Sequence, residues 1–352
     1  MSLEVKRDDL RTVRHVDDGD PSPGAGEAVL RVDRFAITAN NVTYAAFGAA
    51  MRYWDFFPAS EHGWGRVPVW GHADVAASTV DALPVGTRVY GYLPMATHLV
   101  VRPDRVTDAG FVDASEHRAA LPPVYNQYQR VAPTDTERET AVLRPLFTTS
   151  FLLDDWFDDG GMNGATQVVL ASASSKTALG LAHLLSQRAD VEVVGLTSTG
   201  NAEFVDGVGY YDRTVTYDDI ASLDANVPTA FVDMAGGGVT LAAVHNHFAF
   251  SLKASCLVGA THWEESAPPA ELPGPQPSFF FAPDRVVKRR QDWGPDGFES
   301  RVETAWKAFL ASVAGWLTIV ERRGADELEA TWLEVVDGRT PPDVGYVVSP
   351  TD

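Results

Sequence analysis

The sequence is poor in cysteine and in positive charge. Cys256 is the only cysteine among 352 residues, which excludes an internal disulfide and a thiolate-rich metal site and is typical of a reducing compartment. Lysine and arginine total 28 against 48 aspartate and glutamate residues, a formal net charge of −20. This charge argues against nucleic acid or an anionic membrane as a partner, and a bound anion would need positive charge supplied locally.

The sequence also lacks a long hydrophobic run. No stretch reaches the length that spans a membrane, and residues 1–9 lack the apolar core of a signal peptide. We therefore expect a cytoplasmic protein. Hydrophobic residues make up 45% of the chain and charged residues 22%, which is ordinary for a soluble globular protein, and the length is sufficient for two domains.

The first 105 residues are rich in strand patterns. Residues 26–37 alternate apolar and polar side chains after a Pro/Gly turn, as a half-buried strand does. Residues 84–91 resemble a turn that feeds a strand, and residues 95–102 predict another. An aromatic-rich loop at 47–70 lies between them. These patterns indicate a β-rich domain at the N-terminus.

From residue 166 to residue 260 the pattern changes to alternating strands and helices. This alternation implies a parallel sheet with helices on both faces, which binds ligands outside the carboxyl ends of its strands. Apolar strands are expected at 167–170, 191–196, 208–211, 230–234 and 253–259, with helices at 177–188 and 239–248. Elsewhere, helices are expected at 136–156 and 299–322, and strands at 331–336 and 344–349.

Residues 167–185 predict a strand, a turn of small hydroxylated residues and a helix. Exposed N–H groups at the start of such a helix, and the positive end of its dipole, make an anion site suited to a pyrophosphate, to which Lys176 would add charge. A nucleoside-triphosphate loop is excluded because Ser175 and Leu170 stand where it needs glycine. The alternative is an ordinary buried connection between a strand and a helix.

The chain resembles the medium-chain dehydrogenase/reductase superfamily over nearly its whole length. Residues 26–32, 68–72 and 84–91 are similar to segments of its catalytic domain, and residues 231–237 and 257–259 to strands of its nucleotide domain. Ser-Ser-Lys-Thr at 174–177, Tyr-Asn-Gln-Tyr at 125–128 and Phe-Phe-Phe-Ala-Pro at 279–283 look like an uncharacterised, zinc-independent side branch that resembles the quinone and enoyl reductases.

This resemblance implies an α/β protein in three segments. Residues 1–135 would form a GroES-like, β-rich catalytic domain, and residues 136–280 a nucleotide-binding domain with a Rossmann-type, doubly wound parallel sheet. Residues 281–352 would supply a C-terminal helix and strands that return to the catalytic domain. The resemblance further implies a small-molecule substrate and makes a homodimer a fair expectation.

The resemblance also implies a dinucleotide at the turn. Small residues replace the superfamily's glycines at Ala171, Ser174, Ser175 and Thr177, and their side chains take some of the room that glycine leaves. Residues 196–201, at the end of the second strand, include no acid that would bind the ribose diol of NAD, so their hydroxyls favour the 2′-phosphate of NADP(H). The predicted cofactor residues are Ser172, Ser174, Ser175, Lys176, Thr177, Thr197, Ser198, Asn201, Gly236 and Gly259.

No metal is expected. His72 stands where zinc-dependent members of the superfamily have Gly-His-Glu, but Ala73 and Asp74 follow it, and zinc needs three or four Cys, His or carboxylate ligands. His245 and His247 are two residues apart on an expected helix and would face different sides. His72 is therefore predicted to be a structural or pocket residue.

In a zinc-independent reductase the hydride comes from the nicotinamide, and the protein must stabilise and protonate the developing charge. The quinone and enoyl reductases carry an Asn-containing segment with a Tyr in the following loop. By this resemblance Tyr44 and Tyr53 are candidate proton donors and Asn41 orients them. Tyr125, Asn126 and Tyr128 are candidate substrate residues. The alternative for each tyrosine is simple packing within a hydrophobic cap.

Three functional hypotheses follow. The first is an NADPH-dependent, zinc-independent oxidoreductase that reduces a carbonyl or an activated alkene of an apolar or aromatic substrate. The second is a non-catalytic sensor or binding protein that keeps the fold and binds NADP(H). The third is non-redox chemistry without a dinucleotide, since fold does not fix function.

Overall fold

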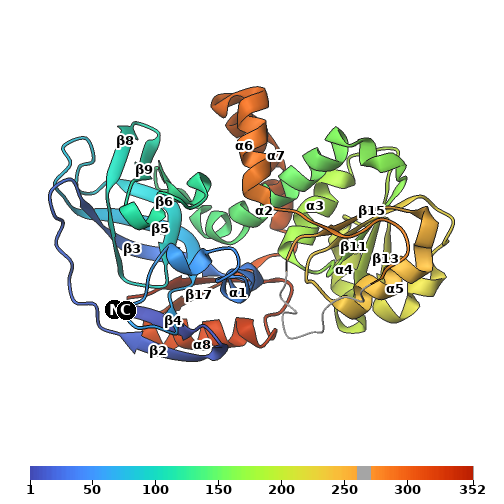
Figure 1. Ribbon diagram of the computed structural model, residues 1–352, viewed down its shortest axis with the longest axis horizontal. Helices are drawn as coiled ribbons and strands as arrows, with labels where there is room; N and C mark the ends of the chain where they lie inside the picture. The colour runs from blue at the N-terminus through green and yellow to red at the C-terminus, as the bar shows by residue number, and fades with distance from the viewer. Residues whose placement is uncertain (260–270, 352) are drawn as a thin grey trace. The chain divides into compact units, whose positions relative to one another are not determined.

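The computed structural model describes residues 1–259 and 271–351 (Figure 1). The chain divides into two compact units, Met1–Val142 with Thr318–Asp352 (unit 1) and Leu143–Leu317 (unit 2). The boundary falls inside the long helix α2 (Glu137–Asp159). Among the described residues, no helix is both long and apolar enough to cross a membrane.

Unit 1 is built mainly on antiparallel strands. Its larger sheet has the order β17-β18-β3-β5-β6-β10-β9-β8, with β7 paired to β3, and its smaller sheet has the order β2-β1-β4. In Figure 1 the red C-terminal strands lie with the blue N-terminal ones, because β18 pairs with β3. The strands of unit 1 are β1 (Ser2–Lys6), β2 (Asp9–Val16), β3 (Ala28–Ile37), β4 (Trp64–Gly65), β5 (Pro68–Ser78), β6 (Arg88–Pro94), β7 (His98–Val101), β8 (Pro103–Thr107), β9 (Gly110–Asp113), β10 (Gln127–Arg130), β17 (Thr318–Arg323) and β18 (Val344–Ser349).

Short helices complete unit 1. The α-helices are α1 (Ala39–Ala46) and α8 (Ala325–Val336), and the single turns of 3-10 helix are η1 (Tyr53–Asp55), η2 (Glu116–Arg118) and η3 (Pro123–Asn126). Helix α8 buries Leu328, Thr331, Trp332, Val335 and Val336, a spacing of three and four residues that defines one helical face. The Trp332 indole donates to the Leu10 carbonyl at 2.9 Å, which fastens α8 to β2.

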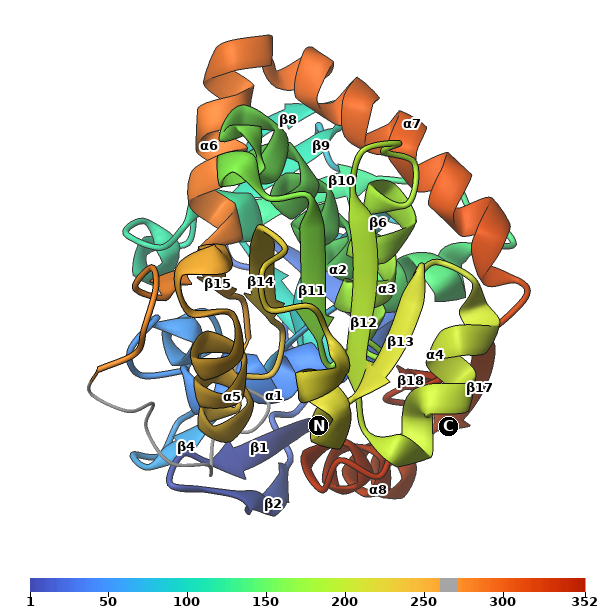
Figure 2. The same ribbon diagram turned by 90° about the vertical axis from the view of Figure 1, so that its right-hand side faces the viewer.

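Unit 2 holds a parallel sheet with the order β13-β12-β11-β14-β15-β16. Figure 2 shows β13, β12, β11, β14 and β15 side by side. Numbered within the unit, the order is 3-2-1-4-5-6, that of the Rossmann fold, so the expected doubly wound architecture is confirmed. The strands are β11 (Gln167–Ala171), β12 (Glu192–Thr197), β13 (Arg213–Thr216), β14 (Thr229–Asp233), β15 (Leu252–Leu257) and β16 (Ser278–Phe279).

The helices of unit 2 connect and flank these strands. Apolar side chains of the strands and of α5 form a buried core that includes Val169, Val194, Phe231 and Val244. Besides the larger part of α2, the unit has α3 (Lys176–Leu185), α4 (Ala202–Val208), α5 (Gly238–Phe248), α6 (Ala282–Trp293) and α7 (Pro295–Val313), with 3-10 turns η4 (Gly161–Gly164), η5 (Thr199–Asn201), η6 (Tyr217–Ser222) and η7 (Ala249–Ser251).

Three expected elements differ from the structure. The strand expected at 208–211 is wrong: α4 ends at Val208, Gly209 follows with φ 76°, and the third strand is β13. The strand expected at 331–336 is the end of α8. The helix expected at 299–322 ends at Val313 and is followed by β17. The short runs at 208–211 and 331–336 fit two periodicities, and packing against the rest of the unit decided between them.

Candidate functional site

The turn between β11 and α3 has the geometry of an anion site. Ser172 adopts φ 53°, the left-handed region, which costs a non-glycine residue about 1 kcal/mol. Ser175 is the N-cap of α3, and its Oγ accepts the Ala178 N–H at 3.3 Å. Lys176 and Thr177 form the first turn of α3, where backbone N–H groups and the helix dipole favour a bound anion.

Side chains from neighbouring segments brace this turn. The Ser172 N–H donates to the Tyr217 hydroxyl at 3.0 Å, and the Tyr211 hydroxyl donates to the Ala173 carbonyl at 2.7 Å. The Asn201 side-chain amide donates to Ser174 Oγ at 3.1 Å. These three hydrogen bonds support a turn that contains no glycine. Sequence reasoning missed Tyr211 and Tyr217, and the only available signal was a pair of tyrosines flanking a polar strand.

The predicted cofactor residues gather at the carboxyl ends of adjacent strands. Ser172, Ser174, Ser175, Lys176 and Thr177 follow β11, while Thr197 ends β12 and Ser198 and Asn201 come after it. Gly236 follows β14, and Gly259 lies two residues beyond β15. The strand order reverses between β11 and β14, and in sheets of this kind ligands bind at that point. The individual residues remain predictions as cofactor contacts.

A carboxylate shapes the loop after β14. Asp233 is buried, and its Oδ1 accepts the N–H groups of Ala235 and Gly236 at 3.0 and 2.9 Å. Gly236 has φ 78°, a conformation that glycine adopts without steric cost. Close by, on β15, Cys256 is fully buried, and burial together with the charge of Asp233 raises the pKa of its thiol to about 12.

In unit 1 the predicted proton donors belong to one buried cluster, hereafter the tyrosine cluster, of Tyr44, Tyr53, Tyr92 and Tyr125. The rings of Tyr44 and Tyr53 are 4.5 Å apart, and those of Tyr92 and Tyr125 are 4.6 Å apart. The hydroxyls of Tyr53 and Tyr125 are 3.3 Å apart, and the Trp70 indole N–H donates to Tyr44 at 3.4 Å. Sequence reasoning missed Tyr92 because its place in the cluster depends on strand pairing.

All four phenols are neutral near pH 7. Burial raises the pKa of Tyr44 and of Tyr53. It also raises the pKa values of Tyr92 and Tyr125 well above the ordinary value, and charge on the neighbouring tyrosines would add to this effect. The cluster can therefore donate hydrogen bonds and protons, but it does not supply a phenolate base.

Asn41 positions the helix that carries Tyr44. Its Oδ1 accepts the Thr38 N–H at 2.7 Å and its Nδ2 donates to the Pro68 carbonyl at 2.8 Å. These bonds cap α1 and tie it to the start of β5. The side chain is 3% exposed. Asn41 would therefore orient Tyr44 indirectly, by holding the backbone of α1 in place.

The predicted substrate residues Asn126 and Tyr128 lie beside a buried ion pair. Arg118 is paired with Asp113 at 2.6 Å and also donates to the Tyr128 hydroxyl at 3.0 Å. Tyr128 in turn donates to the Tyr92 carbonyl at 2.6 Å, and Asn126 donates to the Arg118 carbonyl at 3.2 Å. These contacts fix the strand that carries Tyr92, and contact with a substrate remains a prediction for both residues.

One face of the β5–β6 pair places polar and aromatic side chains in rows. Trp70 is opposite Tyr92, His72 is opposite Tyr90, and Asp74 is opposite Arg88. Because alternate side chains of a strand share a face, these six lie together. His72 is 2% exposed, and burial lowers its pKa to about 4, so its imidazole is neutral at pH 7. Across residues 1–259 and 271–351, no group of three or more His, Cys, Asp or Glu side chains is placed to bind a metal ion.

Arg88 ties this face to the start of α2. Its guanidinium donates to Glu137, Asp33 and Asp74 at 2.7, 2.7 and 2.9 Å. Burial alone would raise the pKa of Glu137, but the hydrogen bond from Arg88 and the nearby positive charges lower it.

The two histidines of α5 also have hydrogen-bond partners within the protein. His245 contacts Ser255 Oγ at 2.8 Å and the Pro273 carbonyl at 2.8 Å, and His247 contacts the Leu223 carbonyl at 2.9 Å.

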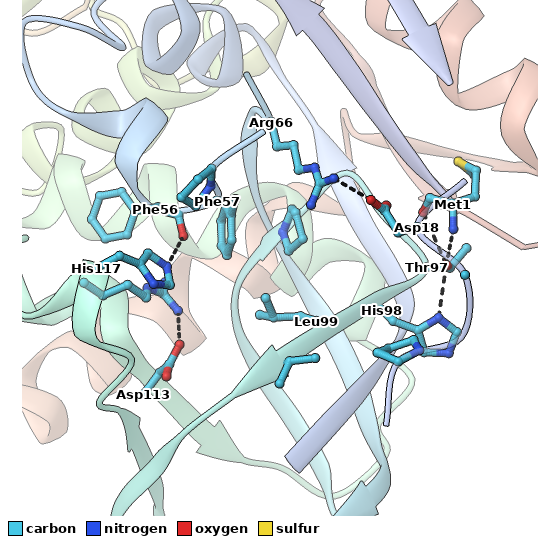
Figure 3. Close-up of a pocket in the computed structure, with 16 residues that line it drawn as sticks. Met1, Asp18, Phe56, Phe57, Arg66, Thr97, His98, Leu99, Asp113 and His117 are labelled. Atoms are coloured by element: carbon cyan, nitrogen blue, oxygen red, sulfur yellow. Dashed lines mark hydrogen bonds and ion pairs between the residues drawn. The ribbon is translucent and has the colours of Figure 1, made fainter. Parts of the chain in front are cut away.

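Unit 1 also contains a pocket of about 240 Å³ (Figure 3). Its walls include Phe56, Phe57 and Leu99. Arg66 on its rim pairs with Asp18 at 2.6 Å, as Figure 3 shows, and Arg118 pairs with Asp113. Because these charged groups neutralise one another, the charges of the pocket do not favour a bound ion.

The two units together define a class: a β-rich unit joined to a Rossmann-type unit, as in several NADP(H)-bound oxidoreductase structures. The chain is similar to CurA from Vibrio vulnificus in complex with NADPH (14% identity, TM-score 0.63, 97% of this chain and 94% of that one). It is similar to the yhdH oxidoreductase from Salmonella enterica in complex with NADP (15% identity, TM-score 0.57, 96% of this chain and 95% of that one). It is also similar to a mycobacterial quinone oxidoreductase (15% identity, TM-score 0.56, 99% of each chain). At these identities the likeness shows the fold alone.

Residues 35–341 match the family described as "Protein of unknown function (DUF2855)", and the chain belongs to that family. No curated protein sequence matches the chain.

Proposed function

We propose that the protein is an NADPH-dependent, zinc-independent oxidoreductase that reduces a carbonyl or an activated alkene of an apolar or aromatic substrate. The observation that carries the proposal is the turn between β11 and α3, which sits at the reversal of strand order in a 3-2-1-4-5-6 sheet. The likeness to structures that contain NADPH or NADP supports it.

The residues at the turn fit a dinucleotide. The N-terminus of α3 and Lys176 would hold the pyrophosphate. Ser198 and Asn201 follow β12 with no carboxylate between them, which suits a 2′-phosphate better than a free ribose diol. The bound nicotinamide would supply a hydride. Tyr44 and Tyr53, both neutral and able to donate, would hydrogen-bond the oxygen on which negative charge develops.

A titration of the purified protein with NADPH and with NADH tests the proposal. We expect tighter binding of NADPH, and weaker binding of it by Lys176→Ala. The matched control is Lys307→Ala, which removes an exposed lysine of the same unit and is expected to bind NADPH normally. Absence of NADPH binding by the folded wild-type protein would refute the proposal.

The departure from a glycine-rich turn, together with the lack of an unmistakable catalytic group, favours a second candidate, a non-catalytic protein that binds NADP(H). The Ser172 N–H and the Ser174 hydroxyl already have partners within the protein, so fewer groups are left for the cofactor than in a glycine-rich turn. This candidate predicts NADPH binding without consumption of NADPH in the presence of ketones, quinones or enones. Substrate-dependent loss of the NADPH absorbance would exclude it.

A further inference from the structure

We propose that the pocket of unit 1 shown in Figure 3 binds a small, uncharged aromatic molecule through one hydrogen-bond acceptor, which receives the Nε–H of Arg118. This site goes beyond the proposed function and does not depend on it. The pocket has a volume of about 240 Å³, and Arg118 lines it. Arg118 is fully buried, and its Nε has no hydrogen-bond partner among the described residues.

The rest of this guanidinium is already engaged. Nη1 donates to Asp113 Oδ2 at 2.6 Å and to the Tyr128 hydroxyl at 3.0 Å, and Nη2 donates to the Tyr125 carbonyl at 3.1 Å. Because a guanidinium is planar, these bonds also fix the direction of the Nε–H. The backbone N–H groups of Arg102 and Ser115 hold the other oxygen of Asp113, so the carboxylate cannot turn toward Nε. The Nε–H stays an unpaired donor, which is rare for a buried group.

Other polar side chains of the pocket have partners within the protein. His117 Nε2 contacts the Phe56 carbonyl at 3.2 Å, and His98 Nδ1 contacts Thr97 Oγ1 at 3.1 Å, as Figure 3 shows. Within the described part of the chain, the Nε of Arg118 is the only buried side-chain polar atom of this lining that has no partner. A ligand atom that bonds it would complete the hydrogen bonds of the pocket.

The unpaired group selects the ligand atom. An arginine Nε–H can only donate, so its partner must be an acceptor. Asp113 already neutralises the charge of Arg118. On the rim, Asp18 and Glu4 do the same for Arg66. An anion would therefore meet no unpaired positive charge, and an uncharged acceptor such as an amide oxygen fits better.

The walls determine the rest of the ligand. Much of the lining is apolar, and it includes Phe56, Phe57, Pro58, Pro94, Leu99 and Val100. Figure 3 shows Phe57 and Leu99 between Asp113 and Arg66. The guanidinium carbon of Arg118 lies 5.0 Å from the centre of the Phe57 ring, so a flat group at the donor would also contact an aromatic face. A cavity of about 150 Å³ can hold benzene, so about 240 Å³ has room for a benzene ring with one small substituent.

A ¹⁹F NMR titration of the full chain with N,N-dimethyl-4-fluorobenzamide tests the inference. The amide oxygen of this probe accepts hydrogen bonds, and the amide has no N–H. We expect the probe to bind about tenfold more tightly than 4-fluorocumene, which has a similar shape without an acceptor, because the donor is a charged group. The matched anion, 4-fluorobenzoate, is expected to bind more weakly than the amide.

Two variants locate the bound probe. Arg118→Lys keeps a positive charge beside Asp113 but has no Nε–H, and it is expected to bind the amide and the cumene equally. Val100→Trp places a large ring at a lining residue that is 37% exposed, and we expect it to weaken amide binding about tenfold. Val85→Trp is the matched control, because Val85 is exposed elsewhere in unit 1 and does not line the pocket, and it should bind the amide normally.

Thermal unfolding shows which variants are folded, and the comparison of the three probes on the wild type needs no variant. Absence of amide binding, equal Kd values for the amide and the cumene, or tighter binding of the benzoate would each overturn the inference. So would wild-type affinity in Val100→Trp, or an unchanged preference for the amide in a folded Arg118→Lys protein. None of these results bears on NADPH binding, so this inference and the proposed function can fail separately.

Discussion

The hydroxyl of Tyr217 accepts the backbone N–H of Ser172 at 3.0 Å, where β11 turns into α3. Ser172 is in the left-handed conformation, which it adopts without the conformational freedom of glycine. A side chain 45 residues away in the sequence thus supports the strained residue of the proposed phosphate site.

Tyr217→Phe removes this support while keeping the ring. We expect NADPH affinity to fall about fivefold, because one hydrogen bond contributes about 1 kcal/mol and a tenfold change in Kd corresponds to about 1.4 kcal/mol. Quenching of protein fluorescence during an NADPH titration measures the Kd. Tyr210→Phe, whose hydroxyl contacts Ser312 in the same unit, should bind as the wild type does. Unchanged affinity in Tyr217→Phe would show that the turn does not need this bond.

Gly195→Ala tests the space behind the same turn. An added Cβ would lie 2.9 Å from a ring carbon of Tyr211 and 3.1 Å from the Ala173 Cβ, so one of them must shift. We expect the free energy of unfolding in urea to fall by about 1–3 kcal/mol, as for other overpacked cores. Gly207→Ala is the control, since nothing lies within 4 Å of its Cβ, and it should stabilise α4 by up to about 1 kcal/mol. Equal stability of Gly195→Ala and wild type would contradict this expectation.

Arg88→Gln tests the ionic contact between the β5–β6 face and α2. It leaves Glu137, Asp33 and Asp74 without their shared cation. Glu137 is the most buried of the three, with a side chain 8% exposed. We expect a loss of about 3 kcal/mol in the free energy of unfolding, the cost of breaking a largely buried ion pair. Arg105→Gln, which breaks an exposed pair with Asp104, should cost less than about 0.5 kcal/mol in the same urea titration.

His72 makes stability depend on pH. Its pKa is about 4 in the folded protein, against an ordinary value of 6.5, so the unfolded chain binds a proton that the folded chain does not. The contribution of the neutral, buried imidazole to the free energy of unfolding is fully present above pH 6.5. It is lost as the pH falls toward 4, by up to about 3 kcal/mol. Urea unfolding at pH 7 and at pH 4.5 measures the loss. His72→Gln should reduce the difference between the two pH values, whereas replacement of the exposed His62 by Gln should not.

The sequence predicts most of the fold because the fold depends on local patterns. The alternation in residues 26–37 becomes β3, and the strand, turn and helix of residues 167–185 become β11 and α3. The third strand of the Rossmann sheet, β13, could not be predicted from a local pattern. Its sequence, Arg213-Thr-Val-Thr216, has one buried side chain and no apolar run. Its strand character comes from pairing with β12.

The sites were less predictable because they depend on register and on distant partners. Residue type and resemblance single out Tyr44 and Tyr53, and the structure brings them together. Tyr92 joins them only because Trp70 pairs opposite it across β5 and β6. Likewise, no spacing in the chain connects Tyr217 to Ser172. Contacts of this kind are set when the strands assemble, and periodicity carries no information about them.

The sole cysteine of the chain has a practical use. Cys256 is sealed inside the parallel sheet as a protonated thiol, so an alkylating reagent can reach it only when the strands around it separate. The rate at which Cys256 is labelled therefore measures how often unit 2 opens locally, and no other thiol contributes to the signal. Slower labelling in the presence of a nucleotide would report that the nucleotide binds.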